Sequence, residues 1–183
     1  MKQFPTAVVA FCLSVSLLGL GCAGKPSKKI EPVIQQYDAV ANVAAPPIKR
    51  GMDKVSSGDL KGAVPDLELG MKEMAKVSSI SIEGCPEDFI MAWGVFASKH
   101  DAARKAVGQF VVNTKNTPDP DNPLAGLAQM LIGGAASAQQ FIQATDEMQD
   151  EATKLKVICS KYGVDGSALD LMSRIDALEN PTP

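Results

Sequence analysis

The sequence predicts an all-α protein, a bundle of four to five helices built around a long antiparallel helical hairpin. Apolar residues recur every three or four positions in nearly every segment, which is typical of amphipathic helices. The one β-like stretch, residues 78–84 ("SSISIEG"), is too short to found a sheet. Residues 30–180 have the length of one domain, so we expect a single helical domain there.

Two helices are expected before residue 78. The first carries an apolar stripe that begins at Ile30, and it should end at Pro46-Pro47 because proline cannot donate a helical hydrogen bond. The second begins near Ser57, and Pro65 should kink it. Residues 58–72 resemble the second helix of a tetratricopeptide repeat. That resemblance covers half of one repeat and no second copy follows, so we interpret the segment as an ordinary amphipathic helix.

The third helix is expected to start at Cys85-Pro86, followed by two acids that suit a helix N-terminus. Its apolar positions alternate between spacings of four and three, which is typical of a helix that packs against other helices. The prolines of residues 117–123 ("TPDPDNP") end it. The stripe comprises Phe89, Trp93, Phe96, His100, Ala103, Val107 and Phe110.

The fourth helix should run from Asn122-Pro123 to Tyr162, and with the third helix it would form the hairpin. Its first part, residues 124–139, is apolar and rich in small residues, which suits burial, insertion into a membrane or close packing on a partner. We expect burial. A short fifth helix should open with Ser167 and Asp170 in the spacing of a capping box and end before Asn180.

Residues 1–21 have the layout of a signal peptide, with a basic start and then an apolar stretch from Thr6 to Leu20. That stretch is shorter than the roughly 20 residues that a membrane-spanning helix needs. It ends in Leu18-Gly19-Leu20-Gly21-Cys22, which resembles the end of a bacterial lipoprotein signal. The resemblance implies that Cys22 is lipidated and becomes the new N-terminus. Ordinary secretion, with cleavage after Gly21 or Ala23, and an uncleaved anchor are the alternatives.

In that family the mature cysteine carries three fatty acyl chains, palmitate among them, and several chains make attachment durable. Residues 22–29 would then be a lipid-anchored tether whose three lysines lie against an anionic surface. The residue after the cysteine influences sorting. Ala23 therefore implies, for a Gram-negative cell, the outer membrane facing the periplasm.

Two other cysteines, Cys85 and Cys159, are predicted to form a disulfide. Export supplies an oxidising compartment, where an even pair of cysteines is usually bonded. A hairpin turn near residue 120 would also bring both cysteines to within about one turn of the same level, at about 1.5 Å of rise per residue. The alternative is a pair of buried, unbonded thiols.

The sequence offers no recognisable catalytic, cofactor-binding or metal-binding motif, so we expect no cofactor and no enzymatic activity. His100 is the one histidine. Its place on the apolar stripe favours a structural role, although a haem or metal ligand could occupy such a position. Asp119 and Asp121 suggest calcium, but prolines interrupt the spacing of a calcium loop and a rigid turn explains the same residues.

The formal net charge of −3 does not favour binding to nucleic acid. The leading hypothesis is a membrane-anchored lipoprotein with a non-enzymatic structural, binding or assembly role in the cell envelope, where an envelope protein would be its partner. The alternative is a helical bundle that binds a small ligand, a haem or a metal through His100 and methionines.

Overall fold

The computed structural model describes residues 25–116 and 135–178. Within these residues the structure contains five α-helices, two short 3-10 helices and no strand, which confirms the all-α class. The elements are α1 (Ser27–Ser56), α2 (Leu60–Met74), η1 (Ala75–Ser79), α3 (Glu87–Lys115), α5 (Ala135–Lys161), η3 (Ser167–Leu169) and α6 (Leu171–Ala177).

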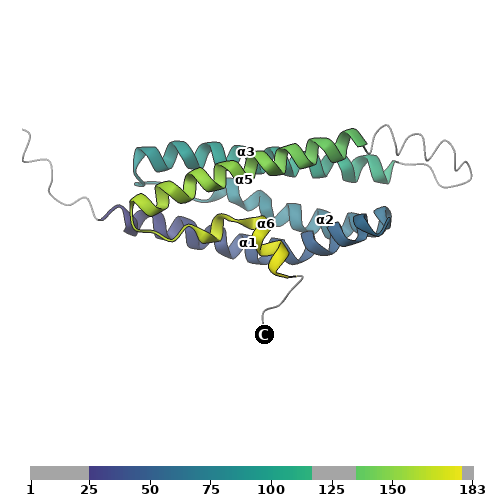
Figure 1. Ribbon diagram of the computed structural model, residues 1–183, viewed down its shortest axis with the longest axis horizontal. Coiled ribbons are helices and arrows are strands. Elements are labelled where there is room, and N and C mark those ends of the chain that lie inside the picture. The colour runs from purple at the N-terminus through teal and green to yellow at the C-terminus, as the bar shows by residue number, and fades with distance from the viewer. Residues whose placement is uncertain (1–24, 117–134, 179–183) are drawn as a thin grey trace, which may run out of the picture.

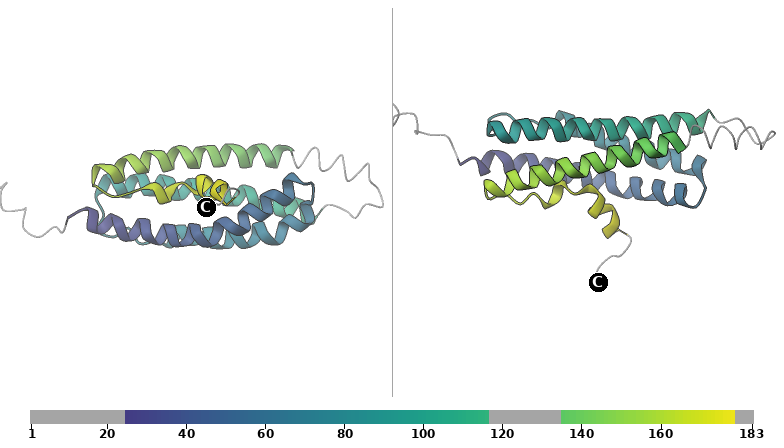
Figure 2. Two further views of the ribbon diagram at one scale, coloured as in Figure 1. Left: turned by 60° about the horizontal axis from the view of Figure 1, so that its bottom comes forward. Right: turned by 45° about the horizontal axis from the view of Figure 1, so that its top comes forward.

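The helices form an elongated bundle (Figure 1). α3 and α5 lie side by side, and α1 packs along α2 on the other side of the core. α2 and η1 run back along part of α1. Residues 80–86 then continue toward the end of the bundle where α1 begins, and α3 starts there. The short helix α6 contacts α1. In the right-hand view of Figure 2 its C-terminal end projects to the side of the bundle.

The main hydrophobic core extends along the bundle and receives side chains from every helix. Its largest fully buried side chains come from α1, η1, α3, α5 and η3, and include Tyr37, Phe89, Phe96, Leu155 and Leu169. A smaller cluster between α2 and α3 is formed by Ala63, Val64, Leu67, Val107 and Val111. The stripe expected for the third helix therefore lies on the buried face of α3, with Ala103 and Phe110 half-buried.

The expected end of the first helix at Pro46-Pro47 is wrong. α1 continues through both prolines to Ser56. Each proline removes one backbone donor, but the residues around them are buried, with Ala44 and Ala45 almost fully covered and Ile48 5% exposed. Packing of this face against α2 stabilises the helical conformation despite the missing hydrogen bonds.

α1 and α2 approach each other closely at two glycines. A Cβ atom at Gly51 would lie 2.6 Å from Leu67 Cγ, and one at Gly70 would lie 2.4 Å from Ile48 Cγ1. Because each contact joins one helix to the other, the glycines set the distance between α1 and α2. Pro65 lies in the first turns of α2, and the helix continues past it to Met74.

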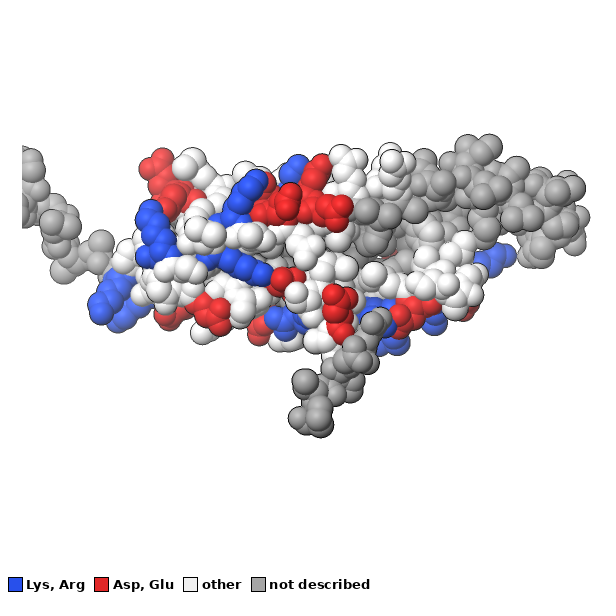
Figure 3. Space-filling model, viewed as in Figure 1, with Lys and Arg blue, Asp and Glu red and all other residues white. Residues whose placement is uncertain are grey.

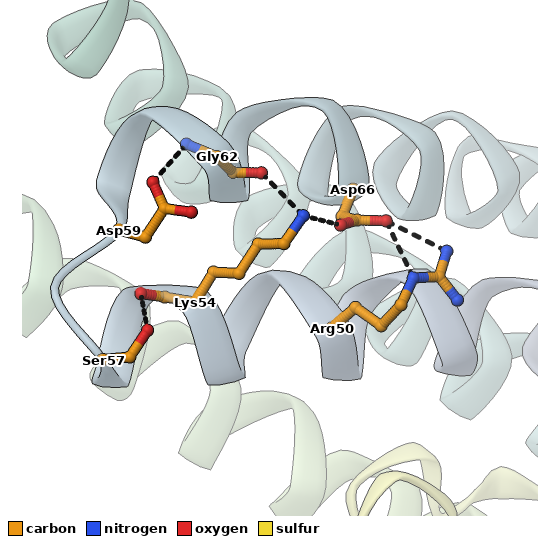
Figure 4. A network of polar contacts seen from close by, with 6 residues as sticks. All are labelled: Arg50, Lys54, Ser57, Asp59, Gly62 and Asp66. Atoms are coloured by element: carbon orange, nitrogen blue, oxygen red, sulfur yellow. Dashed lines mark hydrogen bonds and ion pairs between the residues drawn. The ribbon is translucent and has the colours of Figure 1, made fainter.

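A polar network closes the turn between these two helices (Figure 4). The Asp66 carboxylate accepts from Lys54 Nζ at 2.8 Å and from Arg50 Nε at 3.0 Å, and Lys54 also donates to the carbonyl of Gly62 at 3.1 Å. These hydrogen bonds hold the pKa of Asp66 below its ordinary value. Asp59 caps α2 by accepting from the Gly62 N–H at 2.9 Å.

The N-termini of α3 and α6 differ in how well they match the sequence-based expectation. Glu87 and Asp88 occupy the first turn of α3, as expected. The capping box expected to open at Ser167 is wrong, since Ser167–Leu169 form the 3-10 helix η3 and the cap of α6 is Asp170. The Asp170 carboxylate accepts from the Ser173 N–H at 3.0 Å, so it is an N-cap rather than the far end of a box.

Replacing Gly70 by Ala should destabilise the protein by about 1–3 kcal/mol, because the added methyl group overpacks the contact with Ile48. Gly94→Ala is the matched control. Gly94 is helical and exposed, with open space around it, so alanine there should be neutral or stabilise by up to about 1 kcal/mol. Urea unfolding followed by circular dichroism measures both. Equal effects of the two substitutions would contradict a close contact at Gly70.

Candidate functional site

The centre of the bundle contains a buried polar pair, Tyr37 of α1 and His100 of α3. Tyr37 Oη and His100 Nε2 lie 3.0 Å apart and are hydrogen bonded. Tyr37 is fully buried and His100 is 5% exposed. The two residues are 63 positions apart in the chain, so the bond joins two helices that have no turn in common.

Aromatic rings surround this pair. The Tyr37 ring lies 5.4 Å from Phe96 and 6.2 Å from Trp93 between centroids, and the His100 ring lies 4.5 Å from Phe96 with its edge toward the face. Phe89 stacks on Trp93 at 6.0 Å. Edge-to-face contacts of this kind add to the free energy gained by burial.

Burial controls the charge state of both polar groups. Loss of solvation lowers the pKa of His100 from 6.5 to about 3 and raises the pKa of Tyr37. At neutral pH the imidazole is therefore uncharged and the phenol is protonated. The role expected for His100, a hydrogen-bonded core histidine, matches this environment.

A cavity of about 40 Å³ borders His100 on the side of α6. All five described α-helices contribute to its wall, which is almost entirely apolar. Five of the eight methionines of the chain line it together with His100. They are Met52 of α1, Met71 and Met74 of α2, Met148 of α5 and Met172 of α6.

The cavity has room for an ion or a very small molecule. Pockets for cofactors and drug-sized ligands have volumes of about 300–1,000 Å³, so the haem alternative does not fit this cavity as it stands. Elsewhere in residues 25–116 and 135–178, no three His, Cys, Asp or Glu side chains gather into a metal-binding group.

The disulfide expected between Cys85 and Cys159 is not present in the structure, where both are free and buried. The Cys85 thiol lies 3.4 Å from the carbonyl oxygen of Lys29 and donates to it, so it is directed toward α1. Cys159 is fully buried and its Cβ lies beside Gly166. The two cysteines lie toward the same end of the bundle, but their side chains have different neighbours.

Several expected features lie outside the described residues. Among them are the lipidation residue Cys22, the turn at 117–123 and residues 124–134 of the small-residue segment. The tether lysines Lys25, Lys28 and Lys29 are described and exposed. None of the helices in the described part of the chain is both long and apolar enough to cross a bilayer.

Comparisons with protein-family models, with curated proteins and with solved structures found no match to this chain.

The sequence identified His100 but not the group of methionines around it. Each of them follows the helical spacing of its own segment, so each could be explained as a core residue. Their common position depends on how five helices are arranged. The one sequence feature that could have indicated this group is the number of methionines, since seven of them follow residue 50 in a chain of 183 residues.

Burial of His100 should make the protein less stable in mild acid. Its folded pKa of about 3 lies below the unfolded value of 6.5, so the unfolded state binds a proton that the folded state does not. The stability that depends on a neutral imidazole is complete above pH 6.5 and falls by about 1.4 kcal/mol per pH unit as the pH drops toward 3.

Urea unfolding between about pH 6 and pH 5, where carboxylates titrate little, measures this slope. His100→Gln keeps a hydrogen-bonding partner for Tyr37 but has no titrating ring, so the slope should disappear. An unchanged slope in that variant would show that another group causes it.

The two buried thiols should react slowly. Burial raises the pKa of both, that of Cys159 to about 11, so little thiolate exists at neutral pH. Ellman's reagent should modify Cys85 slowly and Cys159 more slowly in the native protein, and both at once in denaturant. Peptide mapping without reductant tests the same point, because a peptide that links the two cysteines would contradict the structure.

Proposed function

We propose that this protein is a membrane-anchored bacterial lipoprotein whose helical domain has a non-enzymatic structural, binding or assembly role in the cell envelope. The observation that carries the proposal is the segment Leu18–Cys22, which places a cysteine directly after an apolar signal. For a Gram-negative cell, Ala23 favours the outer membrane facing the periplasm.

The position of the N-terminus of α1 is compatible with a short tether to the membrane. α1 begins at Ser27, at one end of the long axis of the bundle (Figure 1). Ser27 lies five positions after Cys22, and an extended chain of that length spans at most about 18 Å. A lipid on Cys22 would therefore hold this end of the bundle close to the bilayer.

Positive charge at the N-terminal end of α1 also favours placing this end of the bundle next to the membrane. The exposed lysines of residues 25–29 lie where α1 begins, and Figure 3 shows basic side chains at that end of the molecule. Lysines near an anionic surface each add about 1 kcal/mol of attraction. They would reinforce the acyl chains rather than replace them.

Exposed apolar side chains near the start of α3 are a reason to expect a protein partner. Ile90, Met91 and Val95 are 38%, 62% and 45% exposed. α3 starts at the end of the bundle where α1 also starts, since the Cys85 thiol contacts Lys29. An envelope protein held at the same membrane is the partner that the proposal implies.

We also propose that α3 and α5 are the two arms of one long antiparallel hairpin. Asp88, at the start of α3, accepts from Lys161 at the end of α5 at 2.6 Å, and Lys99 further along α3 donates to Glu147 at 2.8 Å. As the residue number rises along α3, that of its partner falls along α5. This pattern is the one expected of antiparallel neighbours.

Changing Cys22 to Ser should release the protein from the membrane fraction or block processing of the signal, because serine has no sulfur for lipid attachment. Cys12→Ser is the matched control, since it alters a cysteine inside the apolar signal and leaves Cys22 in place. Fractionation, together with the intact mass of the purified protein, measures both. A Cys22→Ser protein that stayed with membranes at wild-type mass would overturn the anchor.

A further inference from the structure

We propose that the methionine-lined cavity beside His100 is a binding site for one monovalent soft metal ion, Cu(I), held by thioether sulfurs and the imidazole. This site is independent of the proposed anchor and partner, and it requires no enzymatic step. The ion would enter and leave as Cu(I).

The residue types in the wall suit this ion. Thioether and thiolate sulfur are soft ligands that select Cu(I), whereas carboxylate and carbonyl oxygens select Mg²⁺ and Ca²⁺. Among the described residues, the wall contains five thioethers and no carboxylate. Methionine is unbranched and turns about three bonds, so neighbouring side chains can direct their sulfurs to a common point. Methionine also fills gaps in ordinary cores, so the experiment must separate these two roles.

The hydrogen bond of His100 Nε2 would allow Nδ1 of the ring to bind a metal. Within the described part of the chain its one hydrogen bond is the contact of Nε2 with Tyr37 Oη. Metal-bound histidines usually give their other ring N–H to a hydrogen-bond acceptor, which fixes the tautomer and the ring orientation. If Nε2–H donates to Tyr37, the lone pair of Nδ1 is left for a metal.

The charge around the cavity favours a single positive charge over two. Burying a charge costs free energy that rises with the square of the charge, and none of the described residues of the wall is an acid that would neutralise a dication. Arg104 is the charged residue of the wall. Its guanidinium is paired with Asp101 at 2.6 Å, which reduces its repulsion of an entering cation.

Three of the five methionines in the wall are partly exposed to solvent. Met74 and Met148 are 4% and 6% exposed, whereas Met52, Met71 and Met172 are half-buried. Solvent therefore reaches the three half-buried methionines, and Met74, Met148 and His100 form the inner part of the site. α6 covers one side and is tied to α1 by an ion pair of Arg174 with Asp38 at 2.5 Å.

The test measures Cu(I) binding under anaerobic, reducing conditions by competition with a coloured Cu(I) chelator. The background is the full chain with all four cysteines replaced by alanine, because thiolates also bind Cu(I). We expect one Cu(I) per chain. Met74→Leu combined with Met148→Leu should weaken the affinity at least tenfold, while leucine preserves the packing volume.

Met91→Leu is the matched control, because Met91 is on α3 but 62% exposed and outside the cavity. Its affinity should equal that of the background. Circular dichroism confirms that each variant is folded. The proposal is overturned if the background protein does not compete for Cu(I), or if Met91→Leu weakens binding as much as the paired substitution does.

A second measurement does not depend on folding of the variants. With ¹³C-labelled methionine methyl groups, one equivalent of Cu(I), or of Ag(I) as a redox-inert substitute, should shift resonances of cavity methionines, including Met74 and Met148. The Met91 resonance should not move. Shifts at Met91 alone, or at no methionine, would show that the cavity is filled core and not a metal site.

Discussion

The hydrogen bond between Tyr37 and His100 is the interaction on which the arrangement of the bundle depends. Each group alone would be a buried polar side chain without a partner, which costs about 1–3 kcal/mol or more. Paired at 3.0 Å, they fix how α1 and α3 are rotated relative to each other. That rotation turns Ile48 and Met52 of α1 toward the cavity that His100 also borders.

The contact between α1 and α2 depends on backbone proximity rather than on large side chains. Gly51 and Gly70 allow the two helices to approach until Leu67 and Ile48 fill the space that a Cβ would need. This contact explains why α1 tolerates Pro46 and Pro47, since the buried face continues on both sides of them. Local rules for proline describe an isolated helix, and here the packing free energy exceeds the lost hydrogen bonds.

The proposed anchor and the proposed metal site are independent of each other. The anchor rests on a short stretch of sequence before the described residues. The cavity rests on side chains from five helices and on their chemistry. The exposed side chains Ile90, Met91 and Val95 of α3 are not among the residues that line the cavity, so the proposed partner surface and the proposed metal site use different residues.

The sequence by itself determined the all-α class and the inward face of α3, because helical spacing of apolar residues is a local signal. It also identified His100 as a core residue and the acids at the start of α3. It could not determine whether α1 would cross two prolines, which depends on what packs against them. The absence of a Cys85–Cys159 bond was likewise decided by side-chain directions, since Cys85 turns toward Lys29 while Cys159 is packed beside Gly166. The methionine cavity required the tertiary structure for the same reason, because five residues from four helices share a surface only after the helices have packed.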